Sequence, residues 1–184
     1  TLGTLTPGTT STFNYNGSSA GQTIPIGVSS VVYNNLNINN THASGATLSA
    51  AISATNVTGN LNVQTGTLNN GGFAIVGGAA KTISVSNGAF LNLGGTSGFP
   101  SGFGTTALGA TSTVNYNGPG AQTVGNYSYG NLILSVGGTK TFTSSTTIGS
   151  DMSINSGVKA DLGTSLVHTA SNLYLAGAIQ SSGS

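Results

Sequence analysis

Residues 131–157 read NLILSVGGTKTFTSSTTIGSDMSINSG and contain one full period of the pattern that decides the fold of this chain. Leu132 and Leu134 are apolar residues separated by one position, and Met152 and Ile154 form the same kind of pair one period later. Apolar residues at alternate positions are typical of a half-buried β-strand, because successive side chains point to opposite faces. The stretch therefore predicts short strands separated by tight corners such as Gly137-Gly138.

The same pairing recurs along the chain, at Phe13/Tyr15, Leu36/Ile38, Leu61/Val63, Ile83/Val85, Leu91/Leu93, Val114/Tyr116 and Leu173/Leu175. Several successive pairs, such as Leu61/Val63 and Ile83/Val85, are separated by a nearly constant interval. Strand-and-turn units of constant length are typical of a β-solenoid, in which each coil contacts only its neighbours. We predict an all-β chain built as a β-solenoid (β-helix) with coils of about 20–25 residues. The alternative is an antiparallel β-sandwich formed by two repeats, which also has short strands and regular turns.

The chain also contains a longer internal repeat. Residues 11–17, STFNYNG, reappear as residues 112–118, STVNYNG, and residues 33–38, YNNLNI, reappear as residues 129–134, YGNLIL. Ordered matches separated by short gaps indicate stacked units. We expect residues 1–109 to form a first repeat unit of the solenoid and residues 110–184 to form a second, incomplete unit of the same solenoid. The least regular stretch, 94–109, is expected to be a side loop or a break between units.

The composition is almost free of charge. Charged residues make up 3% of the chain, and the net charge is +1, with no Arg, Glu or Cys. This balance disfavours nucleic acid as a partner, because phosphate binding needs a basic surface. The chain has 36% hydrophobic residues and little net charge, which argues against disorder. No apolar stretch is long enough to cross a bilayer, so we expect no membrane insertion.

Asparagine is frequent beside the apolar pairs, at Asn14, Asn16, Asn35, Asn37, Asn60, Asn62, Asn115 and Asn117. Stacked coils place like residues over like, so these amides are expected to form hydrogen-bonded ladders along the stack. Asn and Gly also adopt the left-handed conformations that tight corners require.

No group of residues resembles an active site. Asp151 and Asp161 are the only acidic residues and lie apart in sequence, and His42 and His168 are single histidines. Acid–base chemistry needs such groups close together, and a zinc site needs three or four ligands. We therefore predict no catalytic, cofactor-binding or metal-binding residues, no cofactor, and no enzymatic activity.

Two features raise a binding function as an alternative. Thr-x-Thr pairs occur at residues 4/6, 10/12, 65/67, 111/113, 139/141 and 141/143, and a flat threonine face is one way to bind ice. Six tyrosines are candidates for stacking on sugars, although core or corner packing is the expected role for most of them: Tyr15, Tyr33, Tyr116, Tyr127, Tyr129 and Tyr174.

The phrases STVNYNG (112–118), YGNLIL (129–134), GTKTF (138–142) and IGSDMSINSG (148–157) resemble the repeats of large secreted bacterial surface proteins. These include adhesins of the filamentous-haemagglutinin and autotransporter type and the giant repetitive surface proteins of the Bacteroidetes group. The resemblance covers nearly the whole chain and rests on the style of the repeats. It implies a right-handed parallel β-solenoid, export from the cell, and adhesion or fibre formation.

We therefore expect a structural, non-enzymatic repeat segment of a secreted fibre or adhesin at a bacterial cell surface. Neither end of the sequence looks like a polar cap, and solenoid ends normally need one. The expected partners are other copies or adjacent repeats stacked end to end, together with surface glycans. The alternative function is a carbohydrate- or ice-binding module that uses a flat polar β-face.

Overall fold

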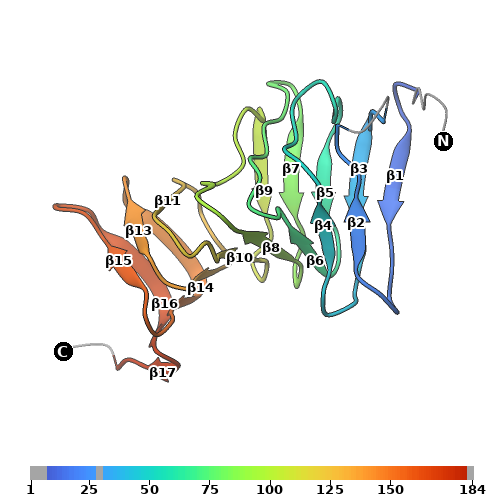
Figure 1. Ribbon diagram of the computed structural model, residues 1–184. Coiled ribbons are helices and arrows are strands. Elements are labelled where there is room, and N and C mark those ends of the chain that lie inside the picture. The colour runs from blue at the N-terminus through green and yellow to red at the C-terminus, as the bar shows by residue number, and fades with distance from the viewer. Residues whose placement is uncertain (1–7, 28–30, 182–184) are drawn as a thin grey trace.

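The computed structural model describes residues 8–27 and 31–181, and every regular element in them is a β-strand (Figure 1). The strands are β1 (Thr12–Tyr15), β2 (Gln22–Ile24), β3 (Asn35–Ile38), β4 (Ala46–Leu48), β5 (Leu61–Val63), β6 (Thr67–Asn69), β7 (Thr82–Val85), β8 (Phe90–Leu93), β9 (Thr105–Leu108), β10 (Thr113–Tyr116), β11 (Gln122–Val124), β12 (Asn131–Leu134), β13 (Thr139–Phe142), β14 (Thr146–Ile154), β15 (Lys159–Asp161), β16 (His168–Leu175) and β17 (Ala178–Ile179). The described residues contain no helix with the length and apolar character needed to span a bilayer.

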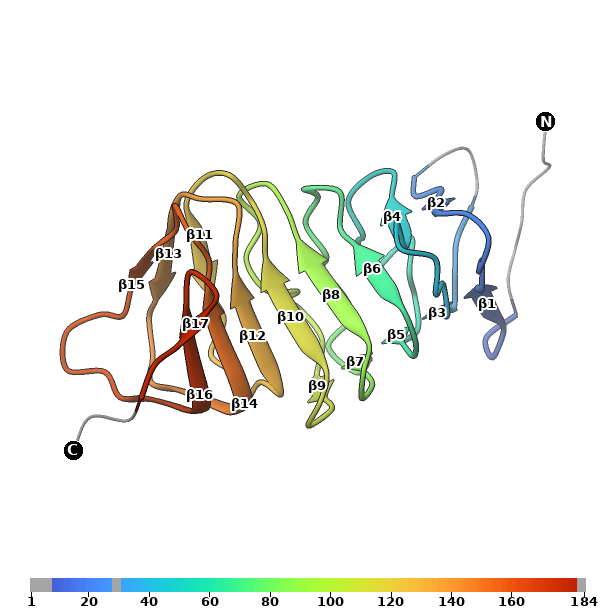
Figure 2. The ribbon, with the colours of Figure 1, turned by 90° about the horizontal axis from the view of Figure 1, so that it is seen from below.

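The strands form three sheets that run along one rod (Figures 1 and 2). The five-stranded sheet has the order β1-β3-β5-β7-β9, and the three-stranded sheet has the order β11-β13-β15. The nine-stranded sheet has the order β17-β16-β14-β12-β10-β8-β6-β4-β2 and extends along the stack from end to end of the described chain. Every strand pair is parallel except β16 with β17.

The chain is thus a parallel β-solenoid of about seven turns, as the spacing predicted. Coil length varies along the rod. Leu36 pairs with Leu61, whereas Val114 pairs with Leu132, so the second of these coils is clearly the shorter. Parallel pairing between successive coils excludes the antiparallel sandwich, because that fold needs neighbouring strands to run in opposite directions.

The core lies inside the coils and follows the alternation read from the sequence. Leu36, Leu61 and Ile83 stack in register in the five-stranded sheet, and each is fully buried. Burial of one such side chain stabilises the fold by about 1.5–3 kcal/mol. Because each coil adds one layer to each column, the core grows along the rod without widening.

The two copies of the internal repeat lie on different sheets. Phe13 of the first copy is in the five-stranded sheet, whereas its counterpart Val114 is in the nine-stranded sheet. Phe13 is connected in register, through four successive coils, to Thr106. Val114 comes eight residues after Thr106, so the chain has already passed to the next face of the rod when it reaches Val114. The repeat length thus rotates the second copy by one face about the rod.

The change of faces occurs where the sequence is least regular. The five-stranded sheet ends at β9, and the three-stranded sheet begins at β11. Phe99 stacks on Tyr127 with ring centroids 4.2 Å apart, and Val76 pairs with Ser101, so the irregular stretch is part of the stack. The division into units 1–109 and 110–184 stays a prediction.

Candidate functional site

The two carboxylates lie apart and have structural partners. Asp151, on β14, accepts a hydrogen bond from Asn172 Nδ2 on the neighbouring β16 at 2.8 Å. Asp161, at the end of β15, accepts one from the Gly163 amide at 3.2 Å. Neither arrangement joins a carboxylate to a second ionisable group. The described residues contain no cluster of three or more His, Cys, Asp or Glu that could hold a metal ion.

The histidines are also tied to their own surroundings. His42 Nδ1 accepts a hydrogen bond from the Ser44 amide at 3.1 Å. His168 packs edge-on against Phe142 with ring centroids 4.6 Å apart, and its Nε2 lies 2.9 Å from the Leu162 carbonyl oxygen. The carbonyl can only accept, so Nε2 carries the proton. Both histidine rings therefore make local structural contacts with neighbouring residues.

Three of the candidate sugar-stacking tyrosines are buried: Tyr33, Tyr116 and Tyr129. The Tyr116 and Tyr129 hydroxyls are 3.1 Å apart, and Tyr129 also donates to the Gly125 carbonyl at 2.7 Å. Burial raises the pKa of Tyr116 to about 12 and raises the pKa values of Tyr33 and Tyr129 further. These rings pack the core and are closed to a sugar. Tyr15, Tyr127 and Tyr174 are half-buried.

The threonines do not form one flat array. Among the described residues, Thr12 lies in the five-stranded sheet, Thr67 and Thr113 lie in the nine-stranded sheet, and Thr139 and Thr141 lie in the three-stranded sheet. The pair Thr4/Thr6 lies outside the described residues. The central outward column of the nine-stranded sheet is mixed and consists of Thr23, Thr47, Asn69, Asn92, Asn115, Ile133, Ser153 and Tyr174.

Asparagine ladders do form on the outer faces. Asn62 Nδ2 donates to Asn37 Oδ1 at 2.8 Å, and Ser84 Oγ donates to Asn62 Oδ1 at 2.9 Å. On the nine-stranded sheet Asn92 Nδ2 donates to Asn69 Oδ1 at 2.8 Å. These bonds run along the rod axis and link coils that are already joined by their backbones.

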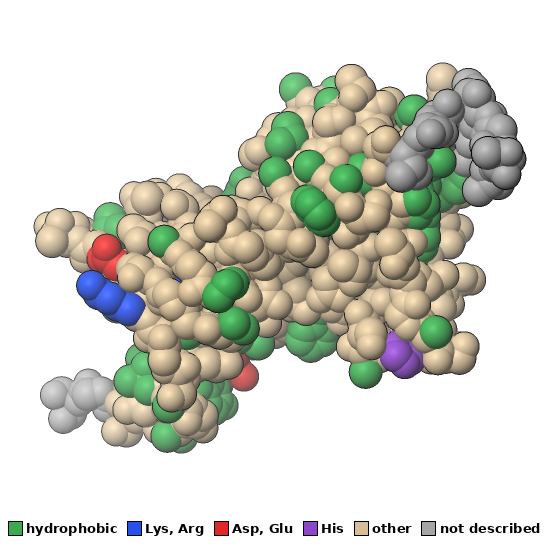
Figure 3. Space-filling model, in the orientation of Figure 1, with side chains coloured by type: hydrophobic (Ala, Val, Ile, Leu, Met, Phe, Trp, Pro, Cys, Tyr) green, Lys and Arg blue, Asp and Glu red, His purple; other side chains and the backbone are tan. Residues whose placement is uncertain are grey.

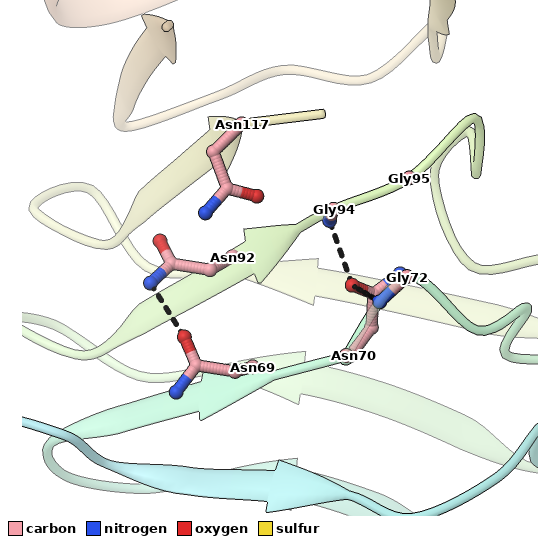
Figure 4. A pocket seen from close by; sticks show the side chains of 8 residues that line it. Asn69, Asn70, Gly72, Asn92, Gly94, Gly95 and Asn117 are labelled. Atoms are coloured by element: carbon pink, nitrogen blue, oxygen red, sulfur yellow. Dashed lines mark hydrogen bonds between the residues drawn. The ribbon is translucent and has the colours of Figure 1, made fainter. Parts of the chain in front are cut away.

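Figure 4 shows a groove beside the second ladder, with a volume of about 300 Å³. Its lining is asparagine and glycine: Asn69, Asn70, Gly71, Gly72, Asn92, Gly94, Gly95 and Asn117. Asn70 Oδ1 accepts from the amides of Gly72 at 3.0 Å and Gly94 at 2.7 Å, while Asn117 Oδ1 is buried without a hydrogen-bond partner. The groove offers neutral hydrogen-bonding groups and contains no acid or base, so it is suited to binding and not to proton transfer.

A buried lysine was missed by the sequence interpretation. Lys140 is fully buried, and its Nζ donates to Gln122 Oε1 at 2.8 Å and to the Gly118 and Gly120 carbonyls. Loss of hydration on burial lowers the pKa of Lys140. The sequence did contain an indication of this burial: Lys140 is two residues from Phe142 in the same strand, so both side chains point to the inward face. Its contacts close a corner between coils and leave the amine inaccessible.

The sequence matches no protein-family model, and neither the curated proteins nor the solved structures include a significantly similar chain. The proposed function therefore rests on the geometry of this chain and on the pattern of its sequence.

Proposed function

We propose that this chain is a structural segment of a secreted fibre or adhesin at a bacterial cell surface, without enzymatic activity. The observation that supports this most directly is the nine-stranded sheet, which runs from β2 to β16 along the whole described stack. Its backbone hydrogen bonds lie along the rod axis, so they couple every coil to the next. A continuous ladder of this kind resists bending and gives a stiff rod.

The surface supports the same proposal. Figure 3 shows a face made almost entirely of uncharged side chains, with Lys and Asp atoms only in its C-terminal part. Stacked like charges repel one another across neighbouring strands. A rod that repeats each position in coil after coil is therefore most stable when that position is neutral, as in the Asn37–Asn62 ladder.

End-to-end stacking is part of the proposal, and the two ends differ in how open they are. β1 is the outermost strand of the five-stranded sheet, and β15 is the outermost strand of the three-stranded sheet. Unpaired edges can add strands from another chain. At the C-terminal end, however, β17 pairs antiparallel with Tyr174 and Leu175 of β16. A second copy must add beside β15 and the first half of β16, or displace β17.

Electron microscopy of the purified chain at neutral pH tests the stacking. Uniform fibres with an axial repeat of about 4.8 Å are expected, because that is the distance between neighbouring strands. A variant without residues 176–184 removes β17 and is expected to form longer fibres. Discrete particles from both chains, at all concentrations tried, would contradict end-to-end stacking and leave a rod that is not a filament subunit.

A second candidate function is binding of a neutral glycan in the asparagine groove. It is favoured by the four asparagine side chains that line the groove, although Asn69 Nδ2 already donates to the Ser44 carbonyl and Asn92 Nδ2 to Asn69 Oδ1. A glycan array probed with the native chain and with Asn92→Ala tests it. Signals that the variant loses support glycan binding, and an array without signals, or with equal signals for both chains, contradicts it. The mixed outward column gives ice binding no such support.

A further inference from the structure

The five-stranded sheet stops at β9 although the rod continues. One edge of β9 pairs with β7, from Thr82 with Thr105 to Val85 with Leu108. No described strand pairs with the other edge. The cause is a short coil: Val114 follows Leu91 in register by a coil of ordinary length, but Leu132 follows Val114 after a clearly shorter one. The shortened coil has too few residues to form the strand that would lie beside β9.

The result is a step in the side of the rod, which Figures 1 and 3 show between β9 and the C-terminal sheets. We call it the β9 shelf: its wall is the free edge of Thr105–Leu108, and residues 125–130 of the next coil run past it from β11 to β12. The shelf closes after β9, because Gly130 passes so near Gly109 that an added Cβ would lie 2.5 Å from the Gly109 carbonyl oxygen.

The free edge carries unpaired backbone groups. The amides of Thr105 and Gly109 donate to the Lys81 and Val85 carbonyls, so they point toward β7. Because amides alternate in direction along a strand, those of Thr106 and Leu108 point toward the shelf. The described residues provide no hydrogen bond for them. β9 alternates exposed and half-buried residues, whereas its neighbour β7 alternates half-buried and buried ones, so the shelf side of β9 is open.

We propose that the β9 shelf binds one extended, uncharged polypeptide segment of a partner protein, which adds to the five-stranded sheet as a sixth strand. Only a polypeptide backbone presents donors and acceptors at the spacing of the free edge. Side chains facing inward would continue the column that ends at Leu108 and are therefore aliphatic. Side chains facing outward would stand beside Ala107 and are therefore small or amide-bearing, as in β1, β3 and β5.

The two strands beside the shelf, β7 and β9, contain no ionisable residue, although Lys81 directly precedes β7. A groove of about 370 Å³ lies at the C-terminal ends of these strands and is lined by Ser84, Val85, Ser86, Asn87, Ala107, Leu108 and Gly109. Its lining comes from the paired strands and the residues directly after them, and shows that the surface near the shelf mixes apolar with hydroxyl and amide groups. This partner site is independent of end-to-end stacking, because it lies on the side of the rod.

A peptide that copies residues 59–65 (GNLNVQT), blocked at both ends, is the probe. It is neutral and carries the pattern of β5 from the same sheet. Titration calorimetry with the whole chain is expected to show saturable one-to-one binding. Two N-methylated versions test the mode of binding: methylation at one set of alternate amides should abolish binding, and methylation at the other set should leave it. Equal binding of both versions, or no saturable binding at millimolar peptide, overturns the proposal.

The location is tested with two proline variants. Thr106→Pro removes one amide that points to the shelf while keeping the Thr105 and Gly109 bonds to β7, and edge strands tolerate proline. It is expected to weaken peptide binding at least tenfold. Asn14→Pro blocks the corresponding free edge of β1 at the end of the rod and should leave binding unchanged. Loss of binding in Asn14→Pro alone would place the peptide at the rod end and overturn the proposal. If Thr106→Pro fails to fold by circular dichroism, the N-methylated peptides decide the outcome.

Discussion

Lys140 and Gln122 are joined by a hydrogen bond of 2.8 Å that has a counterpart in the first repeat, where Asn40 Nδ2 donates to Gln22 Oε1 at 3.0 Å. In both copies the glutamine Oε1 also accepts from the glycine amide of an Asn-Gly corner, Gly17 or Gly118. The same corner is therefore closed by an amide in one copy and by an ammonium group in the other.

Replacing Lys140 by Met should destabilise the fold by about 2 kcal/mol or more, because buried acceptors lose their donor. The donors in the two repeats reach the glutamine from different positions, because Gln122 pairs in register with Lys140 whereas Gln22 pairs with Ala46. The measurement is urea unfolding followed by circular dichroism. Lys159→Met, at an exposed position, is the matched control and should change the free energy of unfolding little. If Lys140→Met matches that control, the corner does not depend on the lysine.

Alkaline pH should destabilise the fold through its buried tyrosines. The folded state raises the pKa of Tyr116 to about 12, and the pKa values of Tyr15, Tyr33 and Tyr129 are also raised by burial. The unfolded chain loses these protons near its ordinary value of about 10, so it binds fewer protons than the folded chain above that pH. The stabilisation is complete below pH 10 and is lost as the pH rises toward 12.

Lys140 has the opposite effect on the pH dependence of stability. Its pKa is lowered in the folded state, so the unfolded chain binds more protons over the interval up to about 10.4 and stability rises with pH there. Urea midpoints measured from pH 8 to 12 should therefore rise toward pH 10 through Lys140 and fall above it through the tyrosines, whereas Lys140→Met should show the fall without the preceding rise. A flat profile above pH 10 would mean that the tyrosines are accessible to water in the folded state.

Substitution of the corner residue Val136 should stabilise the fold. Val136 is 65% exposed and has a φ of 70°, a left-handed conformation that strains a β-branched residue. Val136→Asn should stabilise the fold by about 1 kcal/mol, because Asn adopts this conformation at lower cost. Thermal unfolding checks the change, with Val167→Asn as control for loss of an exposed valine. Equal effects of both substitutions would exclude backbone strain as the cause.

Two glycines with similar backbone angles should respond differently to alanine. Gly66 has a φ of 70°, and an added Cβ would lie 1.7 Å from the Asn40 carbonyl oxygen. Gly88 has a φ of 75° and has no heavy atom within 4 Å of such a Cβ. Gly88→Ala should cost about 1–2 kcal/mol for its conformation. Gly66→Ala should cost over about 4 kcal/mol because neighbouring coils must also separate. Chemical unfolding of the two variants compares them, and equal losses would show that coil spacing adapts freely.

The sequence alone determined the strands that carry apolar pairs, the approximate coil length and the amide ladders, but not β9, which lies in the stretch 94–109 that was expected to be a side loop or a break. Strand pairing and the ladders depend on contacts between residues one coil apart. The sequence distance between the pairs Leu61/Val63 and Ile83/Val85 is therefore the coil length itself. The neutral groove around Asn92 and Asn117 could not be predicted from the sequence, because its lining comes from several coils.

Only the tertiary structure decided which face each residue occupies. The position of a strand around the rod is the sum of all preceding coil lengths, and these vary, since the coil from Leu36 to Leu61 is longer than the coil from Val114 to Leu132. A shorter corner leaves the local alternation unchanged but moves every later strand around the axis. For this reason Phe13 and Val114 share a motif and lie on different sheets, and for this reason β9 has a free edge in the middle of the rod.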